Sequence, residues 1–215
     1  MGNEKQFQEV QVDYVRHDWP AIARALEKGI TPEAFAGLPV PLLDWVWVTP
    51  SDFDDEVNWE DLGQLMQALR RRGLPASAWS EKPEIAFFKH LNYALVEANE
   101  QGLVDWQTHV QSLTTWLDMG VSVQARHTNG RHALAYLMES SMLKFSSHEA
   151  RQLMAGWGQV MLTRSGDERW LMDTLKEGCV YPEFNEVWSQ AVSLERERQL
   201  RTHVGEASSR SRLRG

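Results

Sequence analysis

The chain has 215 residues, of which 42% are hydrophobic and ten are tryptophan. This composition supplies enough apolar material for a packed core and excludes an intrinsically disordered protein. The formal net charge of −8 argues against nucleic acid as a partner, because phosphate binding needs a basic face. It favours a protein partner with a basic surface.

The sequence also limits the compartment in which we expect the protein. It contains one cysteine, Cys179, which excludes an internal disulfide framework and is typical of a reducing compartment. It shows no apolar run of about 18 residues and no charged-then-apolar leader. We therefore expect a cytoplasmic protein with no membrane partner.

Helical periodicity dominates the chain from residue 17 onward. After an N-terminal cap segment at 1–16, the first predicted helix starts near Trp19 and ends at Gly29, and the apolar stretch VPLLDWVWV follows at 40–48. The next helix, at 58–72, has Asn58 as its N-cap and Gly73 as its end. Its apolar positions recur at spacings of three and four and so share one face: Trp59, Leu62, Leu65, Met66 and Leu69.

The same pattern recurs at 105–119, where Asp105 is the predicted cap and Gly120 the end. Trp59 precedes Gly73 by 14 residues and Trp106 precedes Gly120 by 14, so the repeat distance is 47. A fourth copy, ERWLMDTLKEG, ends at Gly178. We predict an all-α chain of stacked helix pairs, because helix pairs that are apolar on more than one face bury those faces by stacking.

The predicted boundaries follow these four copies. One repeat domain would occupy residues 17–200, in units 17–57, 58–104, 105–147 and 148–200. The tail at 201–215 is rich in arginine and poor in apolar residues, so we expect it to be disordered. Gly156 and Gly158 fall inside a helical pattern, where they would permit close helix packing or a kink.

The segment LDMGVSVQARHTNGRHAL, at 117–134, resembles the junction between two ankyrin repeats. Leu117, Asp118 and Gly120 match the end of one helix, and Asn129-Gly130 matches the turn that precedes the next. Val123 and Ala125 match the extended loop between them. The resemblance implies a short α-solenoid with irregular repeats, since the spacings exceed the roughly 33 residues typical of that family. It also implies protein binding, and a degenerate array of this kind fits a bacterial or phage inhibitor, immunity protein or adaptor.

Patterns that would indicate enzyme chemistry are missing from the sequence. It contains no His-Glu-x-x-His, no phosphate-binding glycine loop and no Gly-x-Ser-x-Gly. The acidic stretch at 51–56 lacks the turn glycine and the bidentate glutamate of a calcium loop. We therefore expect no catalytic residue, metal or cofactor. The alternative is a helical enzyme or ligand-binding domain with a pocket lined by His90, Glu97 and His109.

The candidate binding residues are loop residues. The charged loop at 126–131 occupies the position that meets partners in ankyrin arrays, although a solvated loop without function would look the same. Trp79 lies in another predicted loop, where an exposed aromatic side chain could anchor a partner. The candidates are therefore Arg126, His127, Asn129, Arg131 and Trp79. A third hypothesis is nucleic-acid binding through the arginine-rich tail.

Overall fold

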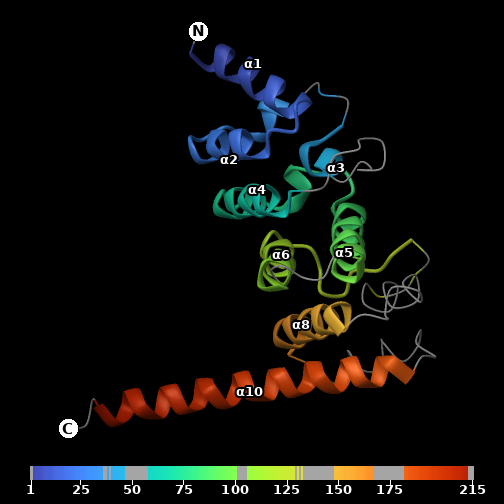
Figure 1. The fold of residues 1–215 in the computed structure, drawn as a ribbon. Helices are drawn as coiled ribbons and strands as arrows, with labels where there is room; N and C mark the ends of the chain where they lie inside the picture. Colours follow the sequence, from blue (N-terminus) through green and yellow to red (C-terminus); the bar gives the residue numbers. More distant parts are fainter. Residues whose placement is uncertain are drawn as a thin grey trace. The chain divides into compact units, whose positions relative to one another are not determined.

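The computed structural model describes residues 2–35, 38, 40–46, 58–100, 106–128, 130, 132, 148–166 and 182–212. Its elements, in chain order, are α1 (Gly2–Val15), α2 (Trp19–Glu27), the 3-10 helix η1 (Pro32–Phe35), α3 (Leu42–Val46), α4 (Trp59–Arg71), the 3-10 helix η3 (Ala76–Ala78), α5 (Pro83–Glu100), α6 (Trp106–Asp118), α8 (His148–Ser165) and α10 (Pro182–Arg212). These described elements include helices and no strand (Figure 1), which confirms the all-α class for this part of the chain. None of the described helices combines the length and the apolar character needed to cross a membrane.

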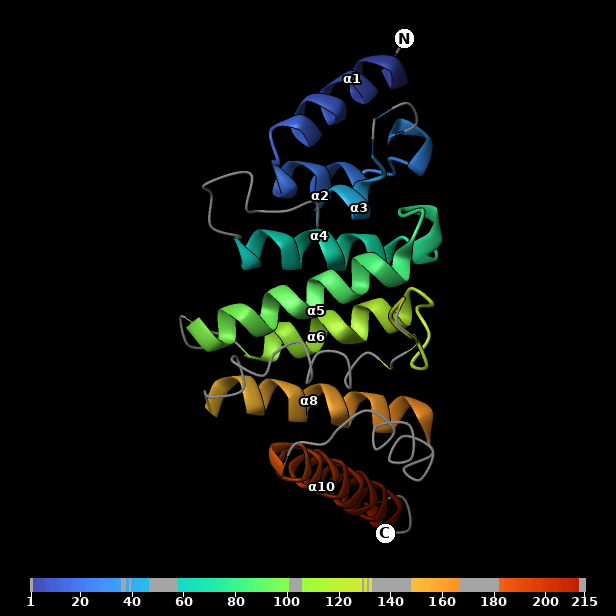
Figure 2. The same cartoon turned by 90° about the vertical axis from the view of Figure 1, so that its right-hand side faces the viewer.

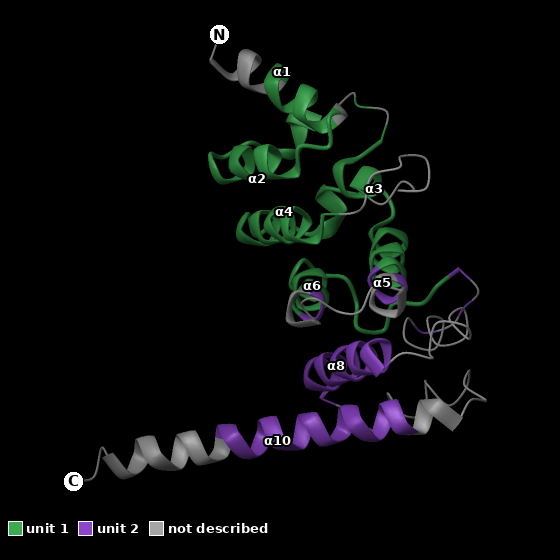
Figure 3. Cartoon of the chain, viewed as in Figure 1, with its two compact units in different colours: residues 1–93, 111–127 green, residues 94–110, 128–215 purple. Residues whose placement is uncertain are grey.

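The chain divides into two compact units (Figure 3). Unit 1 comprises residues 1–93 and 111–127, and unit 2 comprises residues 94–110 and 128–215. The division passes through α5 and α6, so it does not follow the boundaries predicted at 57, 104 and 147 for one domain. A long helix can contact different neighbours at its two ends, and periodicity along the sequence does not reveal where those neighbours change.

The predicted ends of α2, α4 and α6 are confirmed where the structure describes them. The helices α2, α4 and α6 each begin at a tryptophan, as expected. Asn58 caps α4, because its Oδ1 accepts hydrogen bonds from the backbone N–H groups of Glu60 and Asp61 at 3.1 and 3.2 Å. The glycines that follow the three helices have positive φ angles, a conformation that costs glycine little: 100° at Gly29, 67° at Gly73 and 88° at Gly120. The caps predicted at Asp105 and Gly178 lie outside the described residues.

The segments after these glycines are turns, which corrects the extended loop predicted at Val123 and Ala125. The Ala125 N–H donates to the Ser122 carbonyl at 2.9 Å, and η1 and η3 occupy the corresponding places after Gly29 and Gly73. Pro32 favours the turn at η1, because proline fixes φ near the helical value and Pro32 is the first residue of η1. Beyond this turn, Arg126 and His132 are both β-bridge residues.

Unit 1 places its helices in two rows, visible in Figures 1 and 2. The first row contains α2, α4 and the part of α6 that belongs to the unit, and we call it the row of second helices. Beside it lie α3 and the first part of α5. Ile22, Met66 and Leu113 each stand seven residues before their glycine, and all three are at most 1% exposed. Equivalent positions of the sequence pattern therefore supply the core of unit 1.

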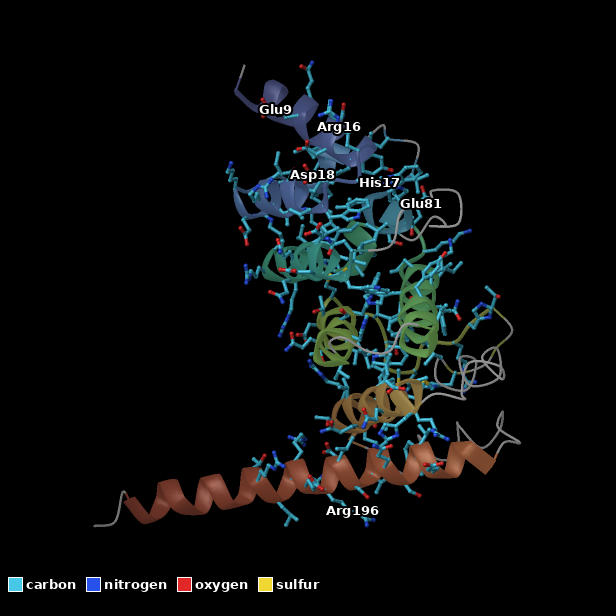
Figure 4. All side chains as sticks on the ribbon, viewed as in Figure 1. Glu9, Arg16, His17, Asp18, Glu81 and Arg196 are labelled. Carbon is cyan, nitrogen blue, oxygen red and sulfur yellow. The ribbon has the colours of Figure 1, made fainter. Side chains whose placement is uncertain are left out.

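The predicted cap segment at 1–16 is occupied by α1, which packs against α2 and η1. Val10 and Tyr14 are buried, and the Tyr14 hydroxyl donates to the Val40 carbonyl at 2.6 Å. Burial, with a smaller contribution from the Asp44 carboxylate, raises the pKa of Tyr14 to about 12. The chain turns sharply into α2 through Arg16, His17 and Asp18 (Figure 4), where His17 has a φ of 56°.

In unit 2, α8 packs against α10. A Cβ atom added at Gly158 would stand only 2.9 Å from the Cβ of Ala191, which confirms that this glycine permits close helix packing. Arg151 and Glu186 form a longer ion pair at 3.9 Å between the same two helices. Three apolar residues of α8 are fully buried: Leu153, Trp157 and Met161.

The helix α10 continues to Arg212, whereas the sequence predicted a disordered tail from residue 201. Ion pairs one helical turn apart support this continuation, between Arg198 and Glu195 at 2.8 Å and between Arg201 and Glu197 at 3.6 Å. The one glycine in that stretch, Gly205, costs about 1 kcal/mol relative to alanine, which is too little to end a long helix by itself.

Candidate protein-binding surface

Ion pairs join the C-terminal ends of successive helices in the row of second helices. Arg71 of α4 contacts Glu27 of α2 at 2.7 Å, and Arg70 of α4 contacts Asp118 of α6 at 2.6 Å. Glu27, Arg71 and Asp118 each stand two residues before the glycine that ends their helix. Charges at equivalent positions therefore alternate in sign along the row. Glu27 pairs with its equivalent, Arg71, whereas Asp118 pairs with Arg70, one residue before the equivalent position.

A hollow of about 340 Å³ lies between α4 and α6. It is lined by Gln67, Arg70, Arg71, Gln111, Thr114 and Thr115. The lining includes two guanidinium groups and two carboxamides, and among the described residues no carboxylate lines it. The side chains of Arg70 and Arg71 remain 51% and 65% exposed, so their ion pairs leave them accessible to another molecule. This part of unit 1 can donate many hydrogen bonds to an acceptor-rich ligand.

The loop predicted as a binding finger is described only in part. Arg126 is exposed, as expected for a contact residue. The His127 ring packs edge-on against Phe88, with 5.3 Å between ring centroids and an interplanar angle of 81°. This contact fixes the start of the loop to α5 within unit 1. Asn129 and Arg131 lie outside the described residues.

Trp79 was wrongly predicted as an exposed anchor. It is only 2% exposed, and its ring lies edge-on to Phe35 at 6.2 Å. Its carbonyl also accepts a hydrogen bond from the Leu43 N–H at 2.8 Å, which ties the end of η3 to the start of α3. The polar neighbours of Trp79 in the sequence suggested a solvated loop, but the 3-10 turn at η3 directs the indole into the core of unit 1.

Asp44 is a structural residue that the sequence did not indicate. Its carboxylate accepts hydrogen bonds from the Ser80 hydroxyl and from the Glu81 N–H, the latter at 2.8 Å. The Ser80 hydroxyl oxygen in turn accepts from the Lys82 N–H at 3.0 Å. These bonds connect α3 to the segment before α5. Asp44 was hard to identify because its partners lie about 36 residues away in the sequence.

The histidines of the alternative enzyme hypothesis have structural surroundings. His90 is 1% exposed, and its Nδ1 accepts a hydrogen bond from the Trp116 indole N–H at 3.0 Å. His109 is 4% exposed, and its carbonyl accepts from the Trp157 indole N–H at 3.2 Å. His90 belongs to unit 1 and His109 to unit 2, and the side chain of Glu97 lies outside the described residues. The described residues contain no group of three or more His, Cys, Asp or Glu side chains that could hold a metal ion.

A second hollow, of about 330 Å³, lies in unit 2 beside Glu195. Glu195 is 8% exposed and accepts hydrogen bonds from three side chains: Arg198, Gln199 and Thr163 of α8. The bonds from the Arg198 guanidinium, followed by those from Thr163 and Gln199, outweigh the effect of burial and lower the pKa of Glu195 to about 2. This cluster connects α8 to α10 and leaves no oxygen of Glu195 without a hydrogen-bond donor.

The lowered pKa predicts how Glu195 affects stability. A carboxylate with a folded-state pKa near 2 and an ordinary value of 4.5 stabilises the fold above pH 4.5, and this contribution is lost as the pH falls toward 2. We expect Glu195→Gln to lower the free energy of unfolding by about 1–2 kcal/mol at pH 7. Urea unfolding at pH 7, 4.5 and 3 should show the difference from the wild type narrowing below pH 4.5. Glu197→Gln is the exposed control and should cost less than about 0.5 kcal/mol; a constant difference at all three pH values would contradict the prediction.

No protein-family model, curated protein or solved structure matches the chain.

Proposed function

We propose that this chain is a non-enzymatic protein-interaction module that acts as an inhibitor, immunity protein or adaptor. It binds its partner along the row of second helices in unit 1, with the loop at 126–131 as an additional contact. The observation that carries the proposal is the pair of ion pairs that join the ends of the three helices, Glu27 with Arg71 and Arg70 with Asp118. These ion pairs link the C-terminal ends of α2, α4 and α6 along the row.

Continuous faces of this kind are what stacked helical repeats use to bind extended partners. The architecture that we propose is therefore an ankyrin-like α-solenoid with irregular repeats, in which a short turn follows the glycine at the end of α2, α4 and α6. The recurrence of tryptophan at the start of α2, α4 and α6, and of positive-φ glycine after them, supports this interpretation. We propose a cytoplasmic location, consistent with the single cysteine.

The proposal is tested by capturing the partner from an extract of the native cells. The baits are the wild-type chain, a loop variant (Arg126→Glu with Arg131→Glu), and a row variant (Gln67→Glu with Gln111→Glu). Gln8→Glu, at an exposed position of α1, is the control for a negative charge added away from the row. We expect one protein to be captured by the wild type and by Gln8→Glu, and to be reduced at least about tenfold with the row variant, equivalent to about 1.4 kcal/mol.

Two results would contradict the proposal. In the first, no protein would be retained by the wild-type bait above the level of an unrelated acidic bait. In the second, the same protein would be retained equally by all four baits, which would place its binding elsewhere. Circular dichroism of each bait verifies that the helices have formed.

A further inference from the structure

We infer that the hollow between α4 and α6 binds an acidic segment of the protein partner, through the carboxylates of that segment. The inference rests on the proposed function and makes it more specific. Net charge alone favours a partner with a basic surface, because the whole chain carries −8. The hollow differs in its lining: its charged lining residues are Arg70 and Arg71, and their ion-pair partners, Asp118 and Glu27, do not line it.

The two guanidinium groups are held in position before any ligand arrives. Asp118 contacts one terminal nitrogen of Arg70, and Glu27 contacts one terminal nitrogen of Arg71. Each guanidinium has five N–H donors, so both retain donors for a second carboxylate. Holding long side chains in place reduces the entropy lost when a ligand binds. The ion pairs along the row therefore prepare the arginines for binding as well as aligning the helices.

The other side chains of the hollow suit the same ligand. The carboxamides of Gln67 and Gln111 supply neutral donors, and they also supply acceptors for the backbone N–H groups of a peptide. The Thr115 hydroxyl donates to the Gln111 carbonyl at 3.1 Å, so its oxygen is left as an acceptor on the wall of the hollow. The volume of about 340 Å³ lies at the lower end of the range of ligand sites, roughly 300–1,000 Å³. It fits one or two side chains of a longer segment.

A phosphate backbone is a poorer occupant of this hollow. Nucleic-acid binding draws on many cationic contacts along a regularly charged strand, whereas the hollow offers two arginines on a chain of strongly negative net charge. A peptide that presents one or two carboxylates needs only the two cationic contacts that Arg70 and Arg71 provide. Because the hollow offers only two cationic side chains, it favours a peptide over a nucleic acid.

The test uses the full chain and a fluorescein-labelled deca-glutamate peptide, with binding followed by fluorescence anisotropy in about 0.1 M salt, where charges more than about 10 Å apart are largely screened. A Ser/Gln peptide of equal length and a ten-nucleotide oligothymidine are the comparison probes. The variants are Arg70→Gln with Arg71→Gln, and separately Gln111→Glu, which adds a carboxylate to the hollow without breaking either ion pair. Gln8→Glu, on α1, adds the same charge away from the hollow.

We expect the deca-glutamate peptide to bind the wild type at least about tenfold more tightly than the Ser/Gln peptide or the oligothymidine. Binding should fall about tenfold in the double arginine variant and about fivefold in Gln111→Glu, and it should stay within twofold in Gln8→Glu. Equal affinity for the glutamate and Ser/Gln peptides would overturn the inference, as would equal weakening by Gln111→Glu and Gln8→Glu. Tighter binding of oligothymidine would identify a phosphate site instead.

Failure of this inference is distinguishable from failure of the proposed function. If a cellular partner is captured by the wild type and is lost with the row variant, but the glutamate peptide does not bind, the interaction module stands and only its acidic ligand is refuted. If no partner is captured while the peptide binds as expected, the hollow is an acidic-ligand site and the proposed module is refuted.

Discussion

Trp116→Ala should lower the free energy of unfolding by about 3–5 kcal/mol, the range for removing a large aromatic side chain from a packed core. Trp116 is fully buried, and its ring meets Phe87 edge-on at 6.0 Å. Its indole N–H also donates to His90 Nδ1, a buried acceptor. Urea unfolding followed by circular dichroism measures the loss.

Trp116→Phe separates the two contributions. It keeps an aromatic ring in the core but removes the donor to His90, so we expect a loss of about 1–3 kcal/mol. If both substitutions cost less than about 1 kcal/mol, Trp116 would not be part of the core, and the packing described for unit 1 would be wrong.

Gly158→Leu should destabilise the contact between α8 and α10 by about 2–3 kcal/mol, near the upper end of the usual cost of overpacking. Any side chain at this position begins with a Cβ that would stand 2.9 Å from the Cβ of Ala191. The better helix propensity of leucine offsets about 1 kcal/mol of the clash, and the estimate includes this gain. The midpoint of thermal unfolding of Gly158→Leu should therefore be lower than that of the wild type.

Two variants serve as the matched control for this prediction. One is the single substitution Gly158→Ala, and the other is the double substitution Gly158→Ala with Ala191→Gly. The single variant places two methyl-sized groups in the space of one, and the double variant removes one of them. The double variant should therefore be more stable than the single one. If Ala191→Gly only adds to the destabilisation, the two helices do not meet at these residues.

Local chemistry made the helix ends predictable. Asn58 and the glycines at 29, 73 and 120 act through their own backbone neighbours, so the sequence around them carries the information. The close packing at Gly158 could also be predicted, because a glycine inside a helical pattern has a cost that packing can offset. These features have causes within a few residues of the position concerned.

Features that depend on distant partners were predicted poorly. Trp79 was judged by its polar sequence neighbours, yet its position is set by Phe35 and Leu43, which are far from it in the chain. The pairing of Glu27 with Arg71 was not predicted either. It could have been found by aligning the helices on their terminal glycines, because the two residues then occupy the same position with opposite charges.

The candidate surface shows the same contrast. The sequence led to loop residues, of which Arg126 is exposed, His127 packs on Phe88 and Trp79 is buried. The hollow between α4 and α6 was missed because its side chains come from two helices about 45 residues apart, and each helix by itself shows only an ordinary polar face. The register between the two helices is what brings Arg70 and Gln111 to one site.

The central claim is that the row of second helices in unit 1 binds a protein. Its most direct test is photo-crosslinking in the native cells, with a benzophenone amino acid placed in turn at Gln67, at Gln111 and at the exposed control position Gln8 on α1. We predict that one partner protein is crosslinked from Gln67 and Gln111 and that none is crosslinked from Gln8. Crosslinks that are absent from both row positions, or equally strong from all three, would contradict the claim.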